Sequence, residues 1–566
     1  MTKDMKIPYG IAHFETNRKN NFLYVDKTHF IHEIEKIEKI IYLRPRRFGK
    51  SLFLDMMDCY YDIAKADAFD DLFNGLYIHE NPTENRNNYY VLRFDFSAMN
   101  STEEISLESS FKEQVLLDVE SFIERYDLDI TLGTKTTSTA SGILETLLNK
   151  FEKLNTGKKV YIMIDEYDHF TNSLLKGNAS DFLTVLQRGG FVRAFYESMK
   201  KKVGTGIVER FFMTGVMSVS LDTMSSGFNI ATNLTTRKRY ADMMGFTADE
   251  VKHLLTQLNL SEKDQVDIYE DLRENYNGYL FSAKGEVKVF NSTLVLYYLK
   301  YYILEDEDPE ELVDSNLNQS GTTIKNIVEL KNKEDNYELI AEIVSNKEVR
   351  GVLLPFIDIE KSFGRNDIIT MLFNIGLLTI KGAGARTRFA MPNKVMESLY
   401  FQYLGDLERR RHDYQIDISK YGQAIDELSE DGKINVLTNF VSDFLQHLSV
   451  RDHIGFDEKY IKLVYMFILN TSNQFIIYDE LPALQGFSDI VILKAPASYS
   501  EYEYLIELKH IKKSEQTDAL ITKKFAEAVQ QIQDYTKDSR LNTRPDLKKF
   551  VVVFSGFEVV KLEEII

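Results

Sequence analysis

The sequence predicts an α/β protein of several domains, with a mostly parallel sheet in its N-terminal half. The chain has 566 residues, more than one hydrophobic core usually organises. Over roughly the first 215 residues, short runs that are apolar on both faces alternate with longer amphipathic segments, as strands and helices do around a parallel sheet. After about residue 300 this alternation stops, and short strands return beyond about residue 460. Several domains of different architecture are therefore expected.

The elements of the N-terminal half follow from their apolar pattern. The expected strands are 39–43, 90–96, 160–164 and 210–215. The expected helices are 51–64, 106–125 and 141–154.

The composition excludes some classes of protein. Cys59 is the single cysteine, which rules out an internal disulfide framework and a four-cysteine zinc site and fits a reducing compartment. We see no signal peptide and no apolar stretch long enough to span a bilayer, so a cytoplasmic protein without a membrane role is expected. The net charge of -19 argues against a protein that coats nucleic acid. It does not exclude a nuclease, which needs acids for metals and only a local basic groove.

A glycine-lysine-serine triplet stands between the first strand and the first long helix, where a P-loop holds the phosphates of a nucleotide. The N–H groups of the helix N-terminus attract an anion. Lys50 would reach the β and γ phosphates, and the Ser51 hydroxyl would bind Mg²⁺. Arg44 takes the place of the first P-loop glycine, so the neighbouring arginines Arg44, Arg46 and Arg47 are candidates for further phosphate contacts. The residues expected to bind ATP in this loop are Arg47, Phe48, Gly49, Lys50, Ser51 and Leu52.

A second motif strengthens this prediction. The apolar strand 160–164 ends in the acids Asp165 and Glu166. Asp165 would hold Mg²⁺ through water, and Glu166 would polarise the attacking water. The alternative is a capped strand end whose acids start a helix. The order and context of the two motifs favour ATP binding. Hydrolysis would in addition require Glu166 to polarise the attacking water.

In combination, these motifs resemble the bacterial AAA-ATPase-like family. The segments that carry the resemblance, over roughly the first 300 residues, are 24–28, 44–51, 164–168, 212–215, 244–247, 276–279 and 289–291. The resemblance implies a P-loop ATPase core in which an arginine-rich loop replaces the first glycine. It makes Thr214 a candidate sensor of the γ-phosphate, with a satisfied core hydroxyl as the alternative. Candidate arginine fingers are Arg193, Arg237 and Arg239.

The C-terminal part brings carboxylates together. The expected strands are 474–478, 489–493, 502–508 and 550–554, with a helix at 520–536. Glu507 and Lys509 are two residues apart and therefore share a sheet face, and Asp489 opens the neighbouring strand. Asp489 and Glu507 would bind Mg²⁺, or Mn²⁺, for phosphodiester cleavage, with Glu480 completing the shell and Lys509 positioning the water.

This arrangement resembles the PD-(D/E)XK nuclease fold, which often follows the ATPase domain in that family. The resemblance adds Gln531, on a helix whose buried face contains Phe525, Val529, Ile532 and Tyr535. Relatives often carry an arginine two residues before the aspartate, where this chain has Phe487.

The predicted organisation is a P-loop AAA-like domain at 1–300, a helical linker at 301–410 whose hairpin at 376–391 resembles a winged-helix module, and a restriction-endonuclease-like domain at 411–566. The predicted function is ATP binding and hydrolysis coupled to a metal-dependent nuclease acting on DNA. The sequence leaves the oligomeric state open, with a homo-oligomer as one candidate because many P-loop ATPases complete their site across a subunit interface. Two alternatives stay open: a nucleotide-switched signalling or scaffold protein with an inactive nuclease fold, and a nuclease with a non-hydrolysing P-loop.

Overall fold

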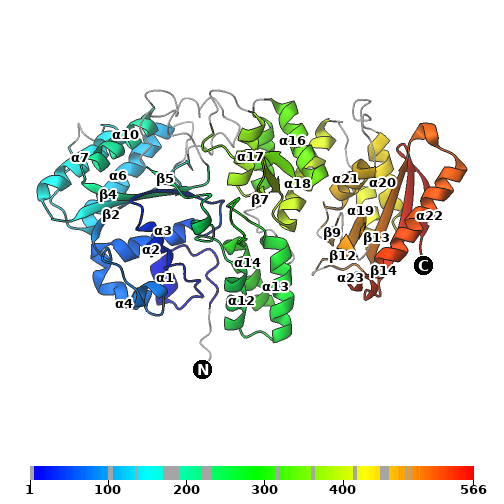
Figure 1. Cartoon of the computed structure of the whole chain (residues 1–566), viewed down its shortest axis with the longest axis horizontal. Helices are drawn as coiled ribbons and strands as arrows, with labels where there is room; N and C mark the ends of the chain where they lie inside the picture. Colours follow the sequence, from blue (N-terminus) through cyan, green and yellow to red (C-terminus); the bar gives the residue numbers. More distant parts are fainter. Residues whose placement is uncertain are drawn as a thin grey trace. The chain divides into compact units, whose positions relative to one another are not determined.

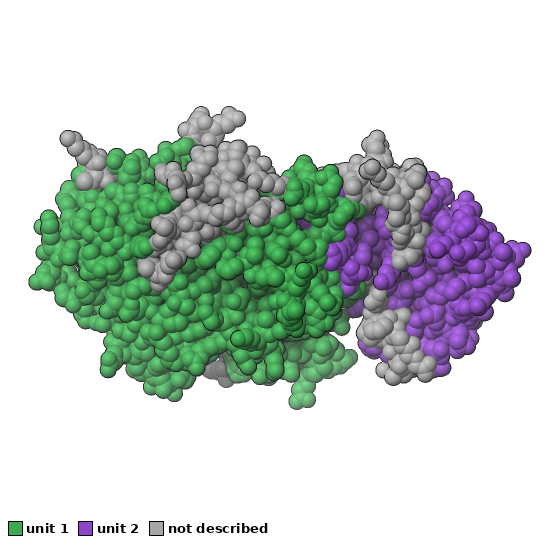
Figure 2. All heavy atoms as spheres, turned by 45° about the horizontal axis from the view of Figure 1, so that its top comes forward, with its two compact units in different colours: residues 1–300, 325–339, 347–396 green, residues 301–324, 340–346, 397–566 purple. Residues whose placement is uncertain are grey.

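The structure is a computed structural model that contains two compact units (Figure 2). The first unit comprises residues 1–300, 325–339 and 347–396, and the second comprises 301–324, 340–346 and 397–566. The segment expected as a linker is thus divided between the two. The structure describes residues 6–97, 99, 106–133, 138–169, 190–217, 231–309, 311–312, 319–330, 332–357, 364–411, 417–446, 458–470, 472, 474–478, 482–483, 486–495 and 498–566.

A five-stranded sheet organises the first unit. Its strands are β1 (Lys39–Leu43), β2 (Tyr89–Asp95), β3 (Lys159–Asp165), β4 (Val208–Gly215) and β5 (Thr232–Asn233). Their order is β2-β3-β4-β1-β5, and all neighbours are parallel, which confirms the predicted parallel sheet. Because β4 separates β1 from β3, the two motif-bearing strands end one strand apart at the same edge.

Helices cover both faces of this sheet, which is why its central strands are continuously apolar. Helices α6 (Leu107–Arg125), α7 (Ala140–Leu154) and α10 (Phe191–Gly204) lie on one side, and α3 (Lys50–Tyr61) lies on the other (Figure 1). Helix α7 buries Ile143, Leu144, Leu147 and Leu148, a helical repeat of apolar positions. The other helices used below are α12 (Ala248–Gln257), α13 (Glu262–Tyr276) and α14 (Ser292–Glu305).

A small module completes the first unit. It contains β6 (Val349–Gly351), helix α17 (Arg365–Asn374), and the strands β7 (Thr379–Gly382) and β8 (Thr387–Ala390). The strands form an antiparallel sheet in the order β6-β8-β7. The predicted hairpin is therefore present, preceded by a helix as in a winged-helix module.

The second unit is built on a mixed sheet. Its strands are β9 (Phe475–Tyr478), β12 (Ile490–Lys494), β13 (Glu503–Ile511), β14 (Leu547–Ser555) and β15 (Glu558–Glu564), in the order β15-β14-β13-β12-β9. Only β13 and β14 are parallel among these pairs, and helix α22 (Asp518–Tyr535) connects them, as a parallel crossover requires.

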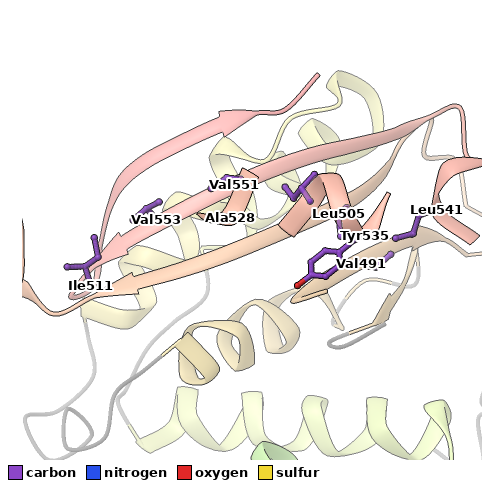
Figure 3. Close-up of a cluster of buried hydrophobic side chains, with 9 residues drawn as sticks. Val491, Leu505, Ile511, Ala528, Tyr535, Leu541, Val551 and Val553 are labelled. Carbon is purple, nitrogen blue, oxygen red and sulfur yellow. The ribbon is translucent and has the colours of Figure 1, made fainter. Parts of the chain in front are cut away.

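The core of the second unit lies between α22 and the sheet (Figure 3). Ala528, Ile532 and Tyr535 of the helix pack against Val491, Leu505 and Val551 of the strands. Phe525 and Val529 are partly buried against the same cluster, which confirms the predicted face of this helix. Helix α18 (Lys394–Arg411) leads the chain into this unit, followed by α19 (Ile418–Asp426), α20 (Asn435–Gln446) and α21 (Glu458–Leu469). In the described part of the chain, no helix has both the length and the apolar character needed to cross a membrane.

Candidate functional site

The phosphate loop joins β1 to α3. Its backbone takes left-handed conformations at Arg47 (φ 71°) and Gly49 (φ 85°), and the helix begins at Lys50. A left-handed arginine costs about 1–2 kcal/mol, so the surrounding structure must hold it. The carbonyl of Arg47 accepts hydrogen bonds from the Thr293 amide at 3.1 Å and from the Ser292 hydroxyl at 3.2 Å. The start of α14 therefore fixes the loop.

The distant segments that resemble the AAA-ATPase-like family converge on this loop. The Gly245 amide donates to the carbonyl of Phe48 at 3.0 Å, and a Cβ atom at Gly245 would lie 2.9 Å from the carbonyl oxygen of Phe290. Tyr279 packs its ring edge-on against Phe48, with 4.9 Å between centroids. Segments 244–247, 276–279 and 289–291 thus form the wall behind the loop.

Arg44 is buried away from the cavity beside the loop, which is not where a phosphate contact was expected to place it. Its side chain is 1% exposed and does not line the cavity beside the loop, whereas Arg46 and Arg47 do. The guanidinium lies over the rings of Tyr42 and Phe281, at 4.2 and 4.0 Å. It donates to four carbonyl oxygens at 2.8–3.1 Å, those of Leu43, Thr235, Tyr240 and Ala241. A buried cation needs such partners, so Arg44 turns into the protein and clamps the end of β1.

The paired acids lie beside the start of α3. The Lys50 ammonium is 3.6 Å from Glu166 Oε1, and the Ser51 hydroxyl lies near enough to Asp165 to lower the pKa of that carboxyl. Burial raises the pKa of Asp165, and the contacts with Ser51 and Lys50 partly offset this. Glu166 itself has a left-handed backbone (φ 51°), a strain that is common at functional positions. The structure thus brings together the predicted lysine, serine and both acids.

Asp168, the last residue of the 164–168 motif, is a positioning residue. Its buried carboxylate accepts the amides of Val216 at 3.1 Å and of Met217. A Cβ atom at Gly215 would lie 2.0 Å from its Oδ1. The turn after β3 is therefore anchored to the end of β4, and this anchor determines where Glu166 points.

The remaining candidates of the ATPase half, Thr214 and the three arginines, do not line the cavity beside the loop. The Thr214 hydroxyl is fully buried and donates to the carbonyl of Tyr42 at 2.9 Å, as a core hydroxyl does. Arg193 pairs with Glu197 on its own helix, and Arg239 pairs with Glu33. Neither these two arginines nor Arg237 line the cavity.

A cavity of about 500 Å³ opens beside the loop. Lys50, Ser51, Asp165 and Glu166 line its polar end. Apolar residues line much of the rest. Val25, Met244 and Phe246 belong to the family-like segments 24–28 and 244–247, whereas no motif had singled out Pro8, Ile11, Ala12, Leu23, Met243, Leu254 and Leu296.

In the second unit, three of the predicted nuclease residues meet where β12 begins beside the middle of β13: Asp489 directly precedes β12, and Glu507 and Lys509 lie within β13. Asp489 Oδ2 accepts the Leu508 amide at 2.9 Å, which places Asp489 beside Glu507. The Lys509 ammonium lies 2.8 Å from Glu507 Oε1 and 4.0 Å from Asp489 Oδ2. The prediction that 507 and 509 share a sheet face is therefore confirmed.

The electrostatics of this cluster favour a bound cation. Burial, together with the charge of Asp489, raises the pKa of Glu507. Burial alone would lower the pKa of Lys509, but Glu507 and Glu458 outweigh it and raise this pKa. Glu507 is 1% exposed, and its Oε2 atom has no hydrogen-bond partner. The buried carboxylate of Glu507 and the partly buried one of Asp489 thus lie side by side, and a further positive charge would stabilise them.

Three further residues lie near this cluster, of which Glu458 and Lys462 were not predicted and Tyr535 was predicted only as part of a buried helix face. Glu458 at the start of α21 lies 3.8 Å from the Lys509 ammonium, and Lys462, one turn later, lies 3.8 Å from Asp489 Oδ1. Tyr535 accepts a hydrogen bond from Gln531 at 3.3 Å. Burial, then Glu507 and Asp489, raise the pKa of Tyr535 to about 12, so its hydroxyl and Gln531 lie near the acids. The spacing of Glu458 and Lys462 in the sequence indicates that they share one face of a helix. It does not indicate that this face lies against Asp489 and Lys509.

The described residues contain no group of three or more acidic, histidine or cysteine side chains arranged to hold a metal ion. Glu480, the predicted third ligand, lies outside the described residues. A metal at this site would therefore rely on Asp489 and Glu507. Their buried oxygens and the unpartnered Oε2 atom fit a hard divalent cation.

The fold and these two constellations define a P-loop-type α/β domain followed by a nuclease-type α/β domain. Residues 8–225 match the AAA-ATPase-like family, whose description is "Predicted AAA-ATPase". Residues 456–564 match the PD-(D/E)XK nuclease superfamily. Both predicted resemblances, and their order along the chain, are confirmed.

The chain is also similar to an uncharacterized protein in the vnfD 5' region of Azotobacter chroococcum mcd 1. The two are 26% identical over 322 residues. The aligned part covers 55% of each protein, so the chain spans about half the length of this curated relative.

Proposed function

We propose that the chain binds and hydrolyses ATP and uses this cycle to control a divalent-metal-dependent nuclease that acts on DNA. The juxtaposition of Lys50, Ser51, Asp165 and Glu166 at one end of a cavity carries the ATPase part of the proposal. The phosphates bind at the loop, and the base occupies the apolar end, where its burial contributes to affinity. When bound, Mg²⁺ neutralises phosphate charge; Ser51 and Asp165 are the residues that would hold it.

In this proposal, the phosphates of ATP replace Glu166 as the partner of the Lys50 ammonium. Lys50 turns from Glu166 Oε1, now 3.6 Å away, to the β and γ phosphates. Glu166 is then free to accept a proton from the attacking water. Asp168 and Gly215 keep its backbone in place throughout.

The nuclease part rests on the partly buried Asp489 and the buried Glu507, with Lys509 near both. A divalent cation, Mg²⁺ or Mn²⁺, would supply Lewis acidity toward the scissile phosphate there. Lys509 would leave Glu507 and donate to the phosphate or orient the water. Lys462 on α21 supplies a second cation beside Asp489. Relatives often have an arginine near this aspartate, at the position that Phe487 occupies in this chain.

A row of aromatic rings supports the coupling. Phe48 of the loop contacts Tyr279 and Phe281, with centroids 4.9 and 5.5 Å apart. Phe281 contacts Phe373 of α17 at 5.9 Å, and Phe373 contacts Phe389 of β8 at 6.1 Å. In this proposal the packed rings carry a shift of the loop to the hairpin module, and the chain then continues through α18 into the nuclease domain.

The test incubates purified full-length protein with supercoiled and linear DNA, with Mg²⁺ or Mn²⁺, with and without ATP. Asp489→Asn and Lys50→Ala are compared with Glu563→Gln, an exposed acid on the same sheet. Cleavage should need Asp489 and the metal, and should change with ATP in wild type but not in Lys50→Ala. Cleavage that ignores both ATP and Lys50→Ala would sink the coupling. Intact ATP binding without cleavage of DNA or RNA would favour the switch or scaffold function.

A further inference from the structure

The hairpin module carries an isolated group of basic side chains on the first unit. The segments 347–351 and 379–390 contain five basic residues and one acid: Lys347, Arg350, Lys381, Arg386, Arg388 and Glu348. The whole chain has the opposite balance, with 68 basic and 87 acidic residues. We call the sheet β6-β8-β7, with its connecting loop 383–386, the basic hairpin.

The pairing of β6 with β8 places two of these charges opposite each other. Arg350 and Arg388 are direct partners in the antiparallel register, so both side chains project from the same face. Like charges in this position are destabilising. Lys381 is paired with Glu348 at 3.2 Å, whereas Arg350, Arg386 and Arg388 form no ion pair with any residue that the structure describes. Among the described residues these facing arginines have no counter-ion, and an external anion would relieve their repulsion.

The shape of the basic hairpin narrows the class of anion. Its tip, 382–385, reads Gly-Ala-Gly-Ala, so no large side chain prevents a close approach to a polymer backbone. The exposed tip also lacks the bulky apolar side chains that an acidic peptide or a lipid surface would use as anchors. Guanidinium groups bind phosphate oxygens in pairs. A nucleic-acid backbone offers phosphates at regular spacing.

The helix before the hairpin is not available for reading bases. Residues 367–374 of α17 are all buried. Phe373 packs against Phe281, and a Cβ atom at Gly376, just after the helix, would lie 2.9 Å from Pro45 Cβ. The C-terminal part of the helix thus faces the phosphate loop, whereas residues 383–386 at the tip of the hairpin are exposed. Contacts by the hairpin alone position a protein on a backbone without specifying a sequence.

We propose that the basic hairpin, through Arg350, Arg386 and Arg388, binds the phosphate backbone of nucleic acid independently of sequence, at a surface distinct from the nuclease acids. The surface retains nucleic acid on the first unit whether or not the nuclease domain is engaged. This proposal goes beyond the proposed function, because it requires neither cleavage nor ATP.

The test measures binding alone. Full-length Asp489→Asn protein, without divalent metal or ATP, is titrated into a fluorescent duplex of about 30 base pairs and its single strand, at salt between about 50 and 200 mM. The variant Arg350→Gln/Arg386→Gln/Arg388→Gln is compared with Lys263→Gln/Lys284→Gln/Lys288→Gln, which removes three exposed cations elsewhere on the same unit. Thermal unfolding of both variants confirms that they remain folded.

The hairpin variant should bind at least about tenfold more weakly, with a salt slope smaller by about 2 to 3, because each phosphate contact contributes about 0.9 to the slope on duplex DNA. The lysine variant should bind like its parent, and unrelated sequences should bind equally. The proposal is overturned if the parent does not bind, if both variants weaken binding equally, or if poly-glutamate of equal charge displaces the DNA as well as unlabelled duplex does. If the wild-type protein does not cleave DNA although the hairpin variant weakens binding as expected, the proposed nuclease function fails while the proposal for the basic hairpin stands.

Discussion

Replacing Arg44 by glycine restores the first glycine of the usual P-loop pattern, yet we expect it to destabilise the first unit. The side chain is 1% exposed and donates to four backbone carbonyls. Charged hydrogen bonds of this kind are worth about 1.5–3 kcal/mol each, and part of this is offset by the cost of burying the charge. Removing one member of a buried charged network typically costs about 3–5 kcal/mol.

This loss translates into a measurable change of Tm. The first unit has about 365 residues, and unfolding entropy near the midpoint is about 2.1 cal/mol/K per residue. The unit should therefore unfold roughly 4 to 7 °C lower in Arg44→Gly. Differential scanning calorimetry of the full chain, read at the transition that ATP stabilises, measures this shift. ATP affinity should not rise, because Arg44 does not line the cavity.

The control is Arg46→Gly, which removes the same charge from the same loop. Arg46 is exposed and lines the cavity, so its loss should weaken ATP binding while changing stability by less than about 0.5 kcal/mol. An unchanged Tm in Arg44→Gly, or a rise in ATP affinity, would refute the structural role assigned to Arg44.

Three further outcomes are expected. Lys50→Ala should abolish ATP binding in isothermal titration and should lower the Tm of the nucleotide-free protein less than Arg44→Gly does, since the contacts of its ammonium, 3.6 Å to Glu166 and 3.3 Å to the Pro45 carbonyl, are fewer and longer than those of Arg44; an equal or larger drop in Tm would contradict this. Gly215→Ala should cost about 1–3 kcal/mol, because the new methyl group would lie 2.0 Å from Asp168 Oδ1, whereas Gly204→Ala, with open space around it, should be neutral or stabilising. Burial raises the pKa of Asp118 to about 7 from an ordinary value of 3.8. The folded state therefore holds a proton that the unfolded state has lost, and the Tm should fall as the pH rises from about 4 to 7 and then level off. Asp118→Asn should lack this slope, and an identical pH profile in wild type and variant would exclude it.

Local sequence determined the elements and the motif positions. The apolar strand 160–164 and the triplet at 49–51 identify themselves, because strands buried on both faces and helix N-termini that bind phosphate impose patterns on adjacent residues. The Glu507 and Lys509 pair was equally accessible, since alternation along one strand determines which residues share a face. Both fold classes followed from such local patterns, and both were confirmed.

Only the tertiary structure determined which distant residues meet. The role of Arg44 depends on carbonyls at Thr235, Tyr240 and Ala241, almost two hundred residues away, so no local pattern could distinguish a clamp from a phosphate ligand. Glu458 and Lys462 reach the nuclease acids from a helix that precedes their strands. The unbalanced facing pair of Arg350 and Arg388 exists only through the register of β6 and β8. Sequence determines what each segment prefers locally, whereas long-range packing and strand register determine which charges must be compensated, and by which partner.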